Sequence, residues 1–100
     1  SIKRGFLGIS SQPVKLPEGQ RGGGCQETGL LLVRVEEGSP AQKSGLLLGD
    51  ILVEFDGQKV GDTDDLQALL SGDRVGRAVP ASVIRGGEQK SLQVTIGERG

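Results

Sequence analysis

The sequence predicts an α+β fold: a largely antiparallel sheet of five to six strands, folded into a sandwich or partial barrel and closed by one short and one longer helix. Two observations lead to this class. Apolar runs of strand length recur along the chain, and most are separated by short, glycine-rich turns that suit antiparallel neighbours. Only two segments combine helical spacing with capping residues. Strands therefore outnumber helices, and most connections are too short for a parallel crossover.

The strands are predicted from their apolar runs. The clearest is Gly29–Glu36, whose first half is continuously apolar, as in a central strand, and whose second half alternates. Asp56-Gly57 is a hairpin turn dipeptide, and residues 85–88 form the turn between the last two strands. The predicted strands cover residues 9–12, 29–36, 51–55, 58–60, 78–84 and 92–96.

The short helix is predicted from its end residues. Ser39 fits an N-cap and Pro40 the first helical position, where its missing N–H costs nothing. Gly45 fits the left-handed residue that follows a helix C-terminus. The helix should therefore cover residues 40–44, about one and a half turns.

The longer helix is predicted over residues 62–72. Asp62 or Thr63 can cap it, and further acidic residues lie in its first turn, where the helix dipole favours negative charge. This acidic cluster resembles a calcium-binding loop only superficially. Gln67 stands where that loop needs glycine, and Asp73 where it needs a bidentate glutamate. Capping is the better explanation of the acidic residues.

Composition indicates one small domain over residues 1–100. Apolar residues make up 34% and aromatic residues only 2%, while glycine occurs 18 times, so we expect many turns and a core of Leu, Val and Ile. The net charge of −1 and the scarcity of aromatic rings give no basis for nucleic-acid binding. The longest apolar run, Leu30–Val33, is far shorter than a membrane span. A long surface loop, which we expect to be mobile, is predicted at about residues 13–28.

No catalytic, metal or cofactor site is expected. The chain has no histidine, so it cannot by itself assemble a Ser-His-Asp triad, a Cys-His pair or a histidine-ligated metal. Its one cysteine, Cys25, excludes an internal disulfide and a cysteine-based zinc site. Catalysis by a lysine or carboxylate remains formally open, but no lysine falls at the Ser-x-x-Lys spacing.

The segment Phe6-Leu7-Gly8-Ile9 is the strongest candidate for a binding site. Gly8 permits backbone angles that a Cβ would forbid, so successive N–H groups can point into one concavity that holds an anion. The strand that follows, Ile9–Gln12, is stopped by Pro13, a residue that suits a sheet edge. An anion site beside an exposed edge suits the C-terminus of another polypeptide. The alternative is an ordinary strand entering a turn.

Residues 35–52 resemble the central motif of PDZ domains, with the spacing Gly-Ser-Pro-Ala…Gly-Leu…Gly-Asp, and residues 53–60 continue the likeness. Within that family the chain is similar to the PDZ domains of HtrA/Deg-type serine proteases. The predicted carboxylate loop lies at the very N-terminus, and the longer helix is followed by a Val75-Gly76 turn and two final strands. The resemblance extends over residues 4–99, except in the loop after Pro13.

The resemblance implies roles for the N-terminal residues. The N–H groups of Leu7, Gly8 and Ile9 would bind a terminal carboxylate. Phe6 stands where many PDZ domains have glycine and HtrA-type members often have an aromatic residue. Arg4 would add long-range attraction for the carboxylate, or it is simply a solvated surface charge.

The resemblance also implies a groove between a strand and the longer helix. The receiving strand edge would comprise Ile9, Ser10 and Ser11. Leu66, Leu69 and Leu70 form one stripe of the helix, and at least one of them must be core. Leu66 is the first choice for the groove, with Leu69 or Leu70 beside it. Such a groove would accept an apolar terminal side chain, and without a histidine at the helix start no preference for Ser or Thr is expected.

The sequence thus predicts a peptide-binding module without enzymatic activity of its own. It would capture hydrophobic C-terminal or unfolded segments by strand addition, and would recruit substrate to, or regulate, an HtrA-type serine protease domain on the same chain. Its parent would be extracytoplasmic, in the periplasm or cell envelope, and could be homo-oligomeric. This domain would contact neither membrane nor nucleic acid. The alternative parents are a C-terminal processing or site-two protease, or a secretion or assembly scaffold.

Overall fold

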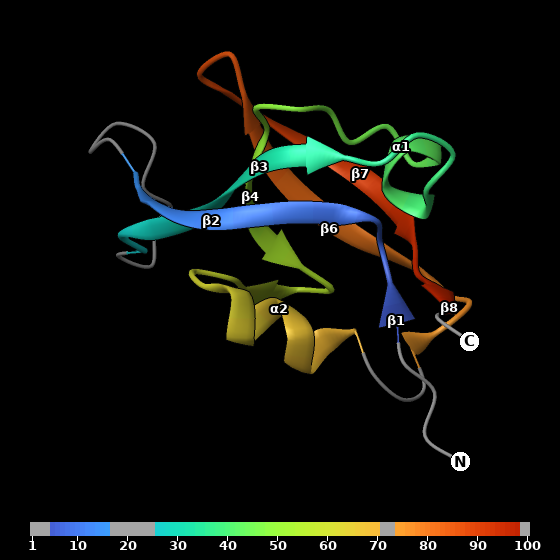
Figure 1. Cartoon of the computed structure of the whole chain (residues 1–100). Coiled ribbons are helices and arrows are strands. Elements are labelled where there is room, and N and C mark those ends of the chain that lie inside the picture. Colours follow the sequence, from blue (N-terminus) through green and yellow to red (C-terminus); the bar gives the residue numbers. More distant parts are fainter. Residues whose placement is uncertain (1–4, 17–25, 71–73, 99–100) are drawn as a thin grey trace.

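The computed structural model describes residues 5–16, 26–70 and 74–98 (Figure 1). In chain order the strands and helices are β1 (Gly5–Phe6), β2 (Ile9–Lys15), β3 (Thr28–Val35), α1 (Pro40–Lys43), β4 (Ile51–Phe55), β5 (Gln58–Lys59), α2 (Thr63–Leu69), β6 (Ala78–Arg85), β7 (Glu88–Thr95) and β8 (Gly97–Glu98). Every predicted strand and both predicted helices are present, with some bounds shifted. The small pair formed by β1 and β8 was not predicted.

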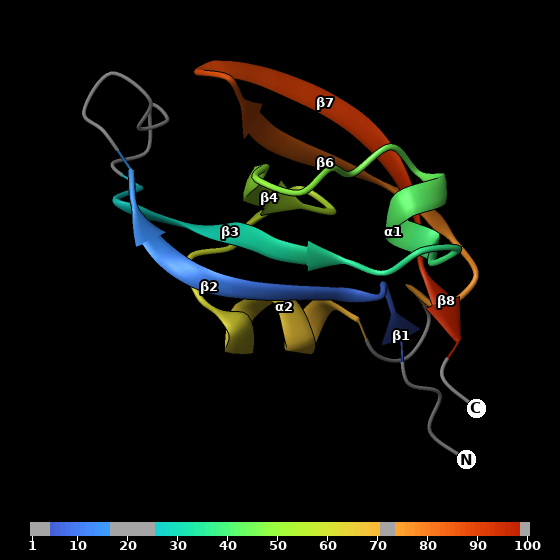
Figure 2. The same cartoon turned by 45° about the horizontal axis from the view of Figure 1, so that its top comes forward.

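The main sheet is antiparallel throughout and has the strand order β2-β3-β4-β6-β7, with β5 paired to β4. Figure 2 shows that it curves, with β2 and β3 on one side and β6 and β7 on the other. The helix α2 lies beside β2, and α1 lies at the end of the molecule that carries β1 and β8 (Figures 1 and 2). The predicted α+β class is confirmed, and the sheet is open rather than a closed barrel.

The curved sheet encloses a core of aliphatic side chains. Phe55 is its only aromatic member, and it is fully buried. The other members come from both halves of the sheet, from both helices and from the connections between elements: Leu7, Leu30, Leu32, Ala41, Leu46, Leu52, Val60, Leu66, Leu70, Val79, Ala81, Val83, Val94 and Ile96. Burying aliphatic surface is the main source of stability in so small a domain.

Side-chain caps fix where both helices begin. The Ser39 hydroxyl accepts a hydrogen bond from the Gln42 N–H at 3.2 Å, and the Asp62 carboxylate accepts one from the Asp65 N–H at 2.8 Å. Asp62, rather than Thr63, is therefore the cap of α2. These bonds satisfy N–H groups that have no partner within the helix.

The predicted loop begins later than expected. Pro13 does not end its strand: β2 continues to Lys15, and Pro13 pairs with Leu30. The prediction failed because β2 is an edge strand, where a proline is tolerated when its nitrogen faces away from the partner strand. The part of the predicted loop at residues 17–25, including Cys25, lies outside the described residues, as do the last residues of the predicted longer helix.

Asp50 is the one charged side chain buried in the described part of the chain, and it is held by Arg85. Arg85 Nε and Nη2 donate to the two Asp50 carboxylate oxygens at 2.8 and 2.7 Å, and the Leu47 N–H donates to Oδ2 at 2.9 Å. Burial raises the pKa of Asp50, but these hydrogen bonds outweigh it, so that the pKa lies below its ordinary value of 3.8. Arg85 also donates to the Gly45 carbonyl at 2.9 Å, which ties the α1–β4 connection to β6.

We predict that Asp50→Asn destabilises the domain by about 3 kcal/mol at pH 7, because it leaves Arg85 without its charged partner. A carboxyl with a lowered folded-state pKa stabilises the fold above pH 3.8, and this contribution is lost as the pH falls from there through the folded-state value. Urea unfolding from pH 7 to pH 2 should therefore show a steeper acid loss in the wild type than in Asp50→Asn. Glu37→Gln, at an exposed position, should keep the wild-type profile. Parallel acid profiles for wild type and Asp50→Asn would contradict this role of Asp50.

Candidate functional site

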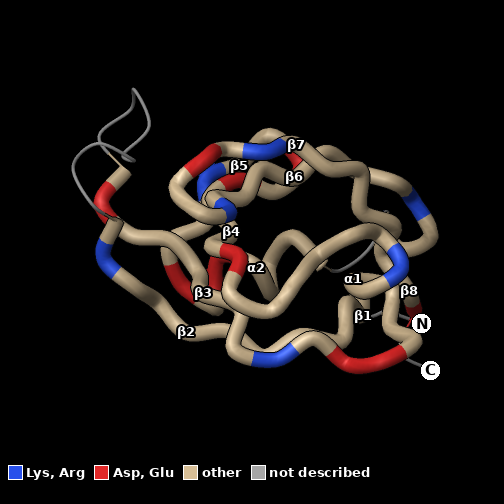
Figure 3. Tube along the Cα trace, turned by 90° about the horizontal axis from the view of Figure 1, so that it is seen from above, with Lys and Arg blue, Asp and Glu red and all other residues tan. Residues whose placement is uncertain are grey.

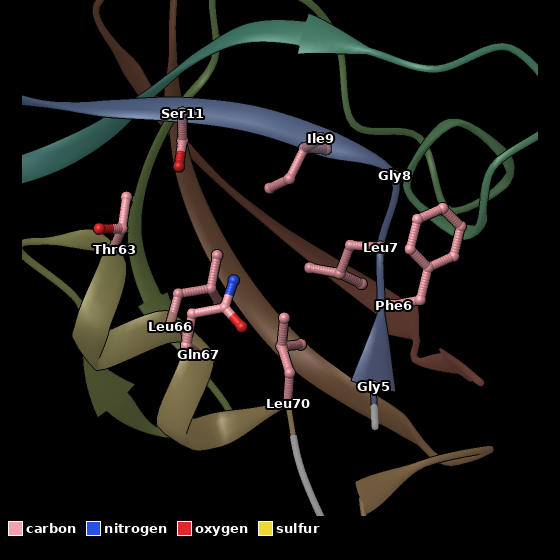
Figure 4. Close-up of a pocket in the computed structure, with 10 residues that line it drawn as sticks. All are labelled: Gly5, Phe6, Leu7, Gly8, Ile9, Ser11, Thr63, Leu66, Gln67 and Leu70. Carbon is pink, nitrogen blue, oxygen red and sulfur yellow. The ribbon is translucent and has the colours of Figure 1, made fainter. Parts of the chain in front are cut away.

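A groove of about 390 Å³ separates β2 from α2 and is headed by the β1–β2 connection. Figure 4 shows the side chains of the two walls facing one another across it. Its lining residues are Gly5, Phe6, Leu7, Gly8, Ile9, Ser11, Thr63, Leu66, Gln67 and Leu70. None of them carries a charge.

The head of the groove is shaped by a tight backbone turn at Gly8. Gly8 has a φ of +82°, and a Cβ built on it would lie 2.3 Å from the Ser39 Cβ. The Leu7 carbonyl accepts from the Ala41 N–H at 2.9 Å, and the Gly8 carbonyl accepts from the Glu36 N–H at 2.8 Å. Both carbonyls therefore point toward the connection between β3 and α1.

The directions of those carbonyls fix the directions of two N–H groups. In a planar trans peptide the C=O of one residue and the N–H of the next point in opposite directions. The N–H groups of Gly8 and Ile9 therefore point away from the β3–α1 connection. The strand pairing leads to the same direction for the Ile9 N–H. Ile9 lies opposite Val35, and the neighbouring hydrogen bond runs from the Glu36 N–H to the Gly8 carbonyl. Ile9 and Val35 therefore form a non-hydrogen-bonded pair, in which the Ile9 N–H points away from β3. At Gly8 and Ile9, the N–H groups thus point to the side on which the predicted concavity should lie.

The strand β2 offers a free edge beside this turn. It is the first strand of the sheet and pairs with β3 on one side, and among the described residues no strand pairs with its other side. That other side faces α2 across the groove (Figure 4). A peptide strand lying there would find backbone donors and acceptors of β2 on one wall and helix side chains on the other.

Most of the predicted site residues lie in this groove. Leu7 is buried at its floor, and Ile9 and Ser11 project into it from β2 (Figure 4). Leu66 projects from α2, and Leu70 projects from its position just after that helix. Leu66 and Leu70 also belong to the main core, so the same side chains serve packing and the groove wall.

Three predicted residues are placed differently. Phe6 lines the groove, but Figure 4 shows its ring turned away from α2. Ser10 is exposed and does not line the groove. Leu69 is partly buried against the main core rather than the groove. Arg4 lies outside the described residues.

Three lining residues were missed: Gly5, Thr63 and Gln67. The predicted stripe followed the leucines, whereas the groove is lined by residues 63, 66, 67 and 70, which are spaced i, i+3, i+4 and i+7 and share one helix face. Extending the stripe through polar residues would have found Thr63 and Gln67. Gly5 carries no side-chain signal, but a Cβ there would lie 1.8 Å from the Leu70 carbonyl oxygen, so only glycine permits this approach.

Charge is spread over the surface rather than gathered at the groove. Figure 3 shows basic and acidic residues interspersed around the described chain. An anion in the groove would therefore be held by backbone N–H groups and not by a lysine or arginine of the lining. Among residues 5–16, 26–70 and 74–98, no cluster of acidic or cysteine side chains is arranged to hold a metal ion, and no helix is long and apolar enough to cross a membrane.

A family model for the PDZ domain matches residues 5–96. The chain belongs to the PDZ domain family. The resemblance noted in the sequence is thereby confirmed, and this PDZ domain contains the motif at residues 35–52 in the segment that runs from the end of β3 through α1 to β4.

Curated relatives of this PDZ domain include probable periplasmic serine endoproteases of the DegP-like type. One from Halomonas elongata is 34% identical over 98% of this chain and 21% of its own length, and one from Ectopseudomonas mendocina is 34% identical over 96% of this chain and 20% of its own length. The chain thus spans about a fifth of the length of these relatives. The predicted likeness to HtrA/Deg-type proteases is confirmed by these sequence identities.

Solved structures share the fold. An HtrA-type protease, AlgW, with a decapeptide has a TM-score of 0.79 and 26% identity, covering 98% of this chain and 30% of that one. The HtrA3 PDZ domain, bound to a phage-derived ligand (FGRWV), has a TM-score of 0.73 and 22% identity, covering 99% of this chain and 89% of that one. The second likeness supports the fold alone.

We predict that Gly8→Ala destabilises this PDZ domain by about 3 kcal/mol, since it combines an unfavourable positive φ with a clash against Ser39. Gly38→Ala is the matched control: its φ is +76°, but nothing lies within 4 Å of its Cβ position, so only about 1 kcal/mol should be lost. Urea unfolding of both variants measures the difference. Equal losses would show that the close contact at Gly8 is unimportant.

Proposed function

We propose that this PDZ domain binds the C-terminal segment of a polypeptide in the groove between β2 and α2. The observation that carries the proposal is the orientation of the Leu7 and Gly8 carbonyls toward Ala41 and Glu36, which leaves the N–H groups of Gly8 and Ile9 directed away from them. A terminal carboxylate would accept hydrogen bonds from these groups. Leu7 N–H completes the proposed set, as the family resemblance implies.

The bound segment would add to β2 as a further strand. Its last side chain would enter the apolar part of the groove, between Leu7 and Ile9 on one wall and Leu66 and Leu70 on the other. Strand periodicity then brings every second side chain of the peptide to the same wall. Four residues of strand addition with one buried side chain suggest affinity of order micromolar, about −8 kcal/mol. The ligands would be hydrophobic C-terminal or unfolded segments.

The likeness to structures that contain peptides is consistent with peptide binding by this fold. AlgW is described with a decapeptide and the HtrA3 PDZ domain with a phage-derived ligand, and both share this fold over nearly the whole chain. Among the residues predicted to contact the peptide, Ser10 and Leu69 have the weakest structural support, because neither lines the groove. Arg4 remains a proposed source of long-range attraction.

We further propose that the domain serves an HtrA-type serine protease on the same chain, either by recruiting substrates or by regulating the protease. The DegP-like relatives are named as periplasmic serine endoproteases, which supports an extracytoplasmic location. In the longer protein, a Gly-Asn-Ser-Gly-Gly-type segment ahead of this domain would support the assignment. Its absence would favour a processing protease, a site-two protease or a scaffold as the parent.

We predict that a six-residue peptide ending in valine binds at least tenfold more tightly with a free C-terminal carboxylate than with a C-terminal amide. The amide has lost the charge that the N–H groups of Gly8 and Ile9 would stabilise, and charge-assisted hydrogen bonds are the stronger kind. Isothermal titration of the two peptides measures the ratio. Equal affinity for both forms would contradict the carboxylate role of these residues.

Strand addition predicts a second pattern in the same peptide. Backbone N-methylation at alternate residues should weaken binding, because those N–H groups would face β2, whereas methylation at the intervening residues should change affinity little. A terminal valine replaced by aspartate serves as the control for the apolar pocket and should abolish measurable binding. Uniform effects of methylation along the peptide would argue against pairing with β2.

A further inference from the structure

We infer that Gln26 is a positioning residue that fixes the N-terminal end of α2, and thereby the width of the groove at the end lined by Ser11 and Thr63. The inference rests on the proposed function of the groove. Gln26 lies just before β3 and far from the lining residues in sequence. Its side-chain nitrogen donates to the backbone carbonyls of Thr28 at 2.9 Å, Val53 at 3.0 Å and Val60 at 3.1 Å.

This arrangement joins three separate parts of the chain at one side chain. Thr28 opens β3, Val53 belongs to β4, and Val60 follows β5 at the start of the connection to α2. All three partners are acceptors, so the amide nitrogen of Gln26 and not its amide oxygen faces them, and its two hydrogens are shared among the three carbonyls. The Val60 N–H donates to the Val53 carbonyl at 3.1 Å, so Gln26 lies at the base of the β4–β5 hairpin.

A close contact of Gly61 holds the same connection. A Cβ on Gly61 would lie 2.6 Å from the Thr28 Oγ1, so the backbone approaches the start of β3 more closely than a side chain would permit. The Gly61 N–H in turn donates to the Asp65 carboxylate at 3.0 Å, and the Asp65 N–H donates to Asp62 at 2.8 Å. An unbroken chain of short contacts therefore runs from Gln26 to the first turn of α2.

Apolar packing alone holds α2 weakly. Leu66 is the only buried residue among Thr63–Leu69, and Leu70 is buried just after the helix. Leu70 lies at the C-terminal end, where its carbonyl meets Gly5, so that end is fixed against β1. The N-terminal end lacks a buried side chain in its first turn. Its position relative to β2 therefore depends on the polar contacts that begin at Gln26.

The consequence for binding depends on peptide length. The carboxylate end of a bound peptide would lie near Gly8 and Leu70, while residues further upstream would reach the end where Ser11 and Thr63 face one another (Figure 4). Loosening the first turn of α2 should therefore weaken the binding of long peptides more than that of short ones. A general loss of stability would weaken both alike.

The test compares Gln26→Glu with the wild type. The substitution keeps the side-chain shape but replaces the donor with a carboxylate, which faces three carbonyl oxygens unfavourably. NMR titration with a hexapeptide and a tripeptide, both ending in valine with a free carboxylate, measures the two affinities. We expect the hexapeptide to bind about three- to tenfold more weakly, as for the loss of one or two hydrogen bonds, and the tripeptide to change less than twofold. Gln93→Glu, at an exposed position on β7, is the matched control and should change neither.

Amide hydrogen exchange gives a readout that does not require a ligand. In Gln26→Glu the amides of α2 should exchange several-fold faster, while those of β6 and β7 keep their protection. Gln26→Ala, which removes the donor without adding charge, should reproduce both effects if the glutamate variant does not fold. Equal weakening of both peptides, or unchanged exchange in α2, would overturn the role of Gln26. If the wild type binds neither peptide, the proposed function fails, and the exchange measurement still decides the positioning role.

Discussion

The groove depends on two hydrogen bonds that lie outside it. Ala41 and Glu36 hold the carbonyls of Leu7 and Gly8, and planar peptide geometry then directs the next N–H groups the other way. Because the donors belong to α1 and to the connection just after β3, the Gly-Ser-Pro-Ala motif does more than start a helix. It packs Ser39 against Gly8 so closely that only glycine fits, and this contact fixes the turn at the head of the groove.

The two ends of α2 are set by one glycine on β1 and one in the connection that leads into the helix, which explains how a seven-residue helix with one buried side chain can form a defined wall. Gly5 lets the Leu70 carbonyl approach β1, and Gly61 lets the connection to α2 approach Thr28. Neither glycine has a positive φ. Glycine is therefore needed at both positions because a Cβ would clash with a neighbouring residue, not because of the backbone conformation. The groove width is thus a property of backbone contacts on both sides of the helix.

Features that rest on local chemistry could be predicted from the sequence, and those that rest on distant contacts could not. Ser39 and Gly8 were identified because a cap and a left-handed turn depend on neighbouring residues. Leu69 was wrongly included among the candidate groove residues, because the sequence does not show which face of the helix turns toward β2. That direction depends on where the helix lies on the sheet. Gln26 gave no signal, because its three partners are backbone carbonyls at sequence separations of up to 34 residues. The pair of Asp50 with Arg85 joins residues 35 apart and was missed for the same reason.

The same physics explains why an open sheet edge can persist in a small domain. Exposed edges invite pairing with other chains, and proteins limit them by proline or by covering elements. Leu32 bonds to Asp50 and Gly49 with its N–H and its carbonyl, so Leu30, two residues earlier in β3, also faces β4 rather than β2. Pro13 lies opposite Leu30, so its missing N–H belongs to the free edge and interrupts the row of donors beyond Gln12. Beside the first part of the strand, α2 stands across the groove. The accessible edge is therefore confined to the few residues after Gly8, and under the proposed function a guest strand would be limited to a short segment whose end lies at the turn.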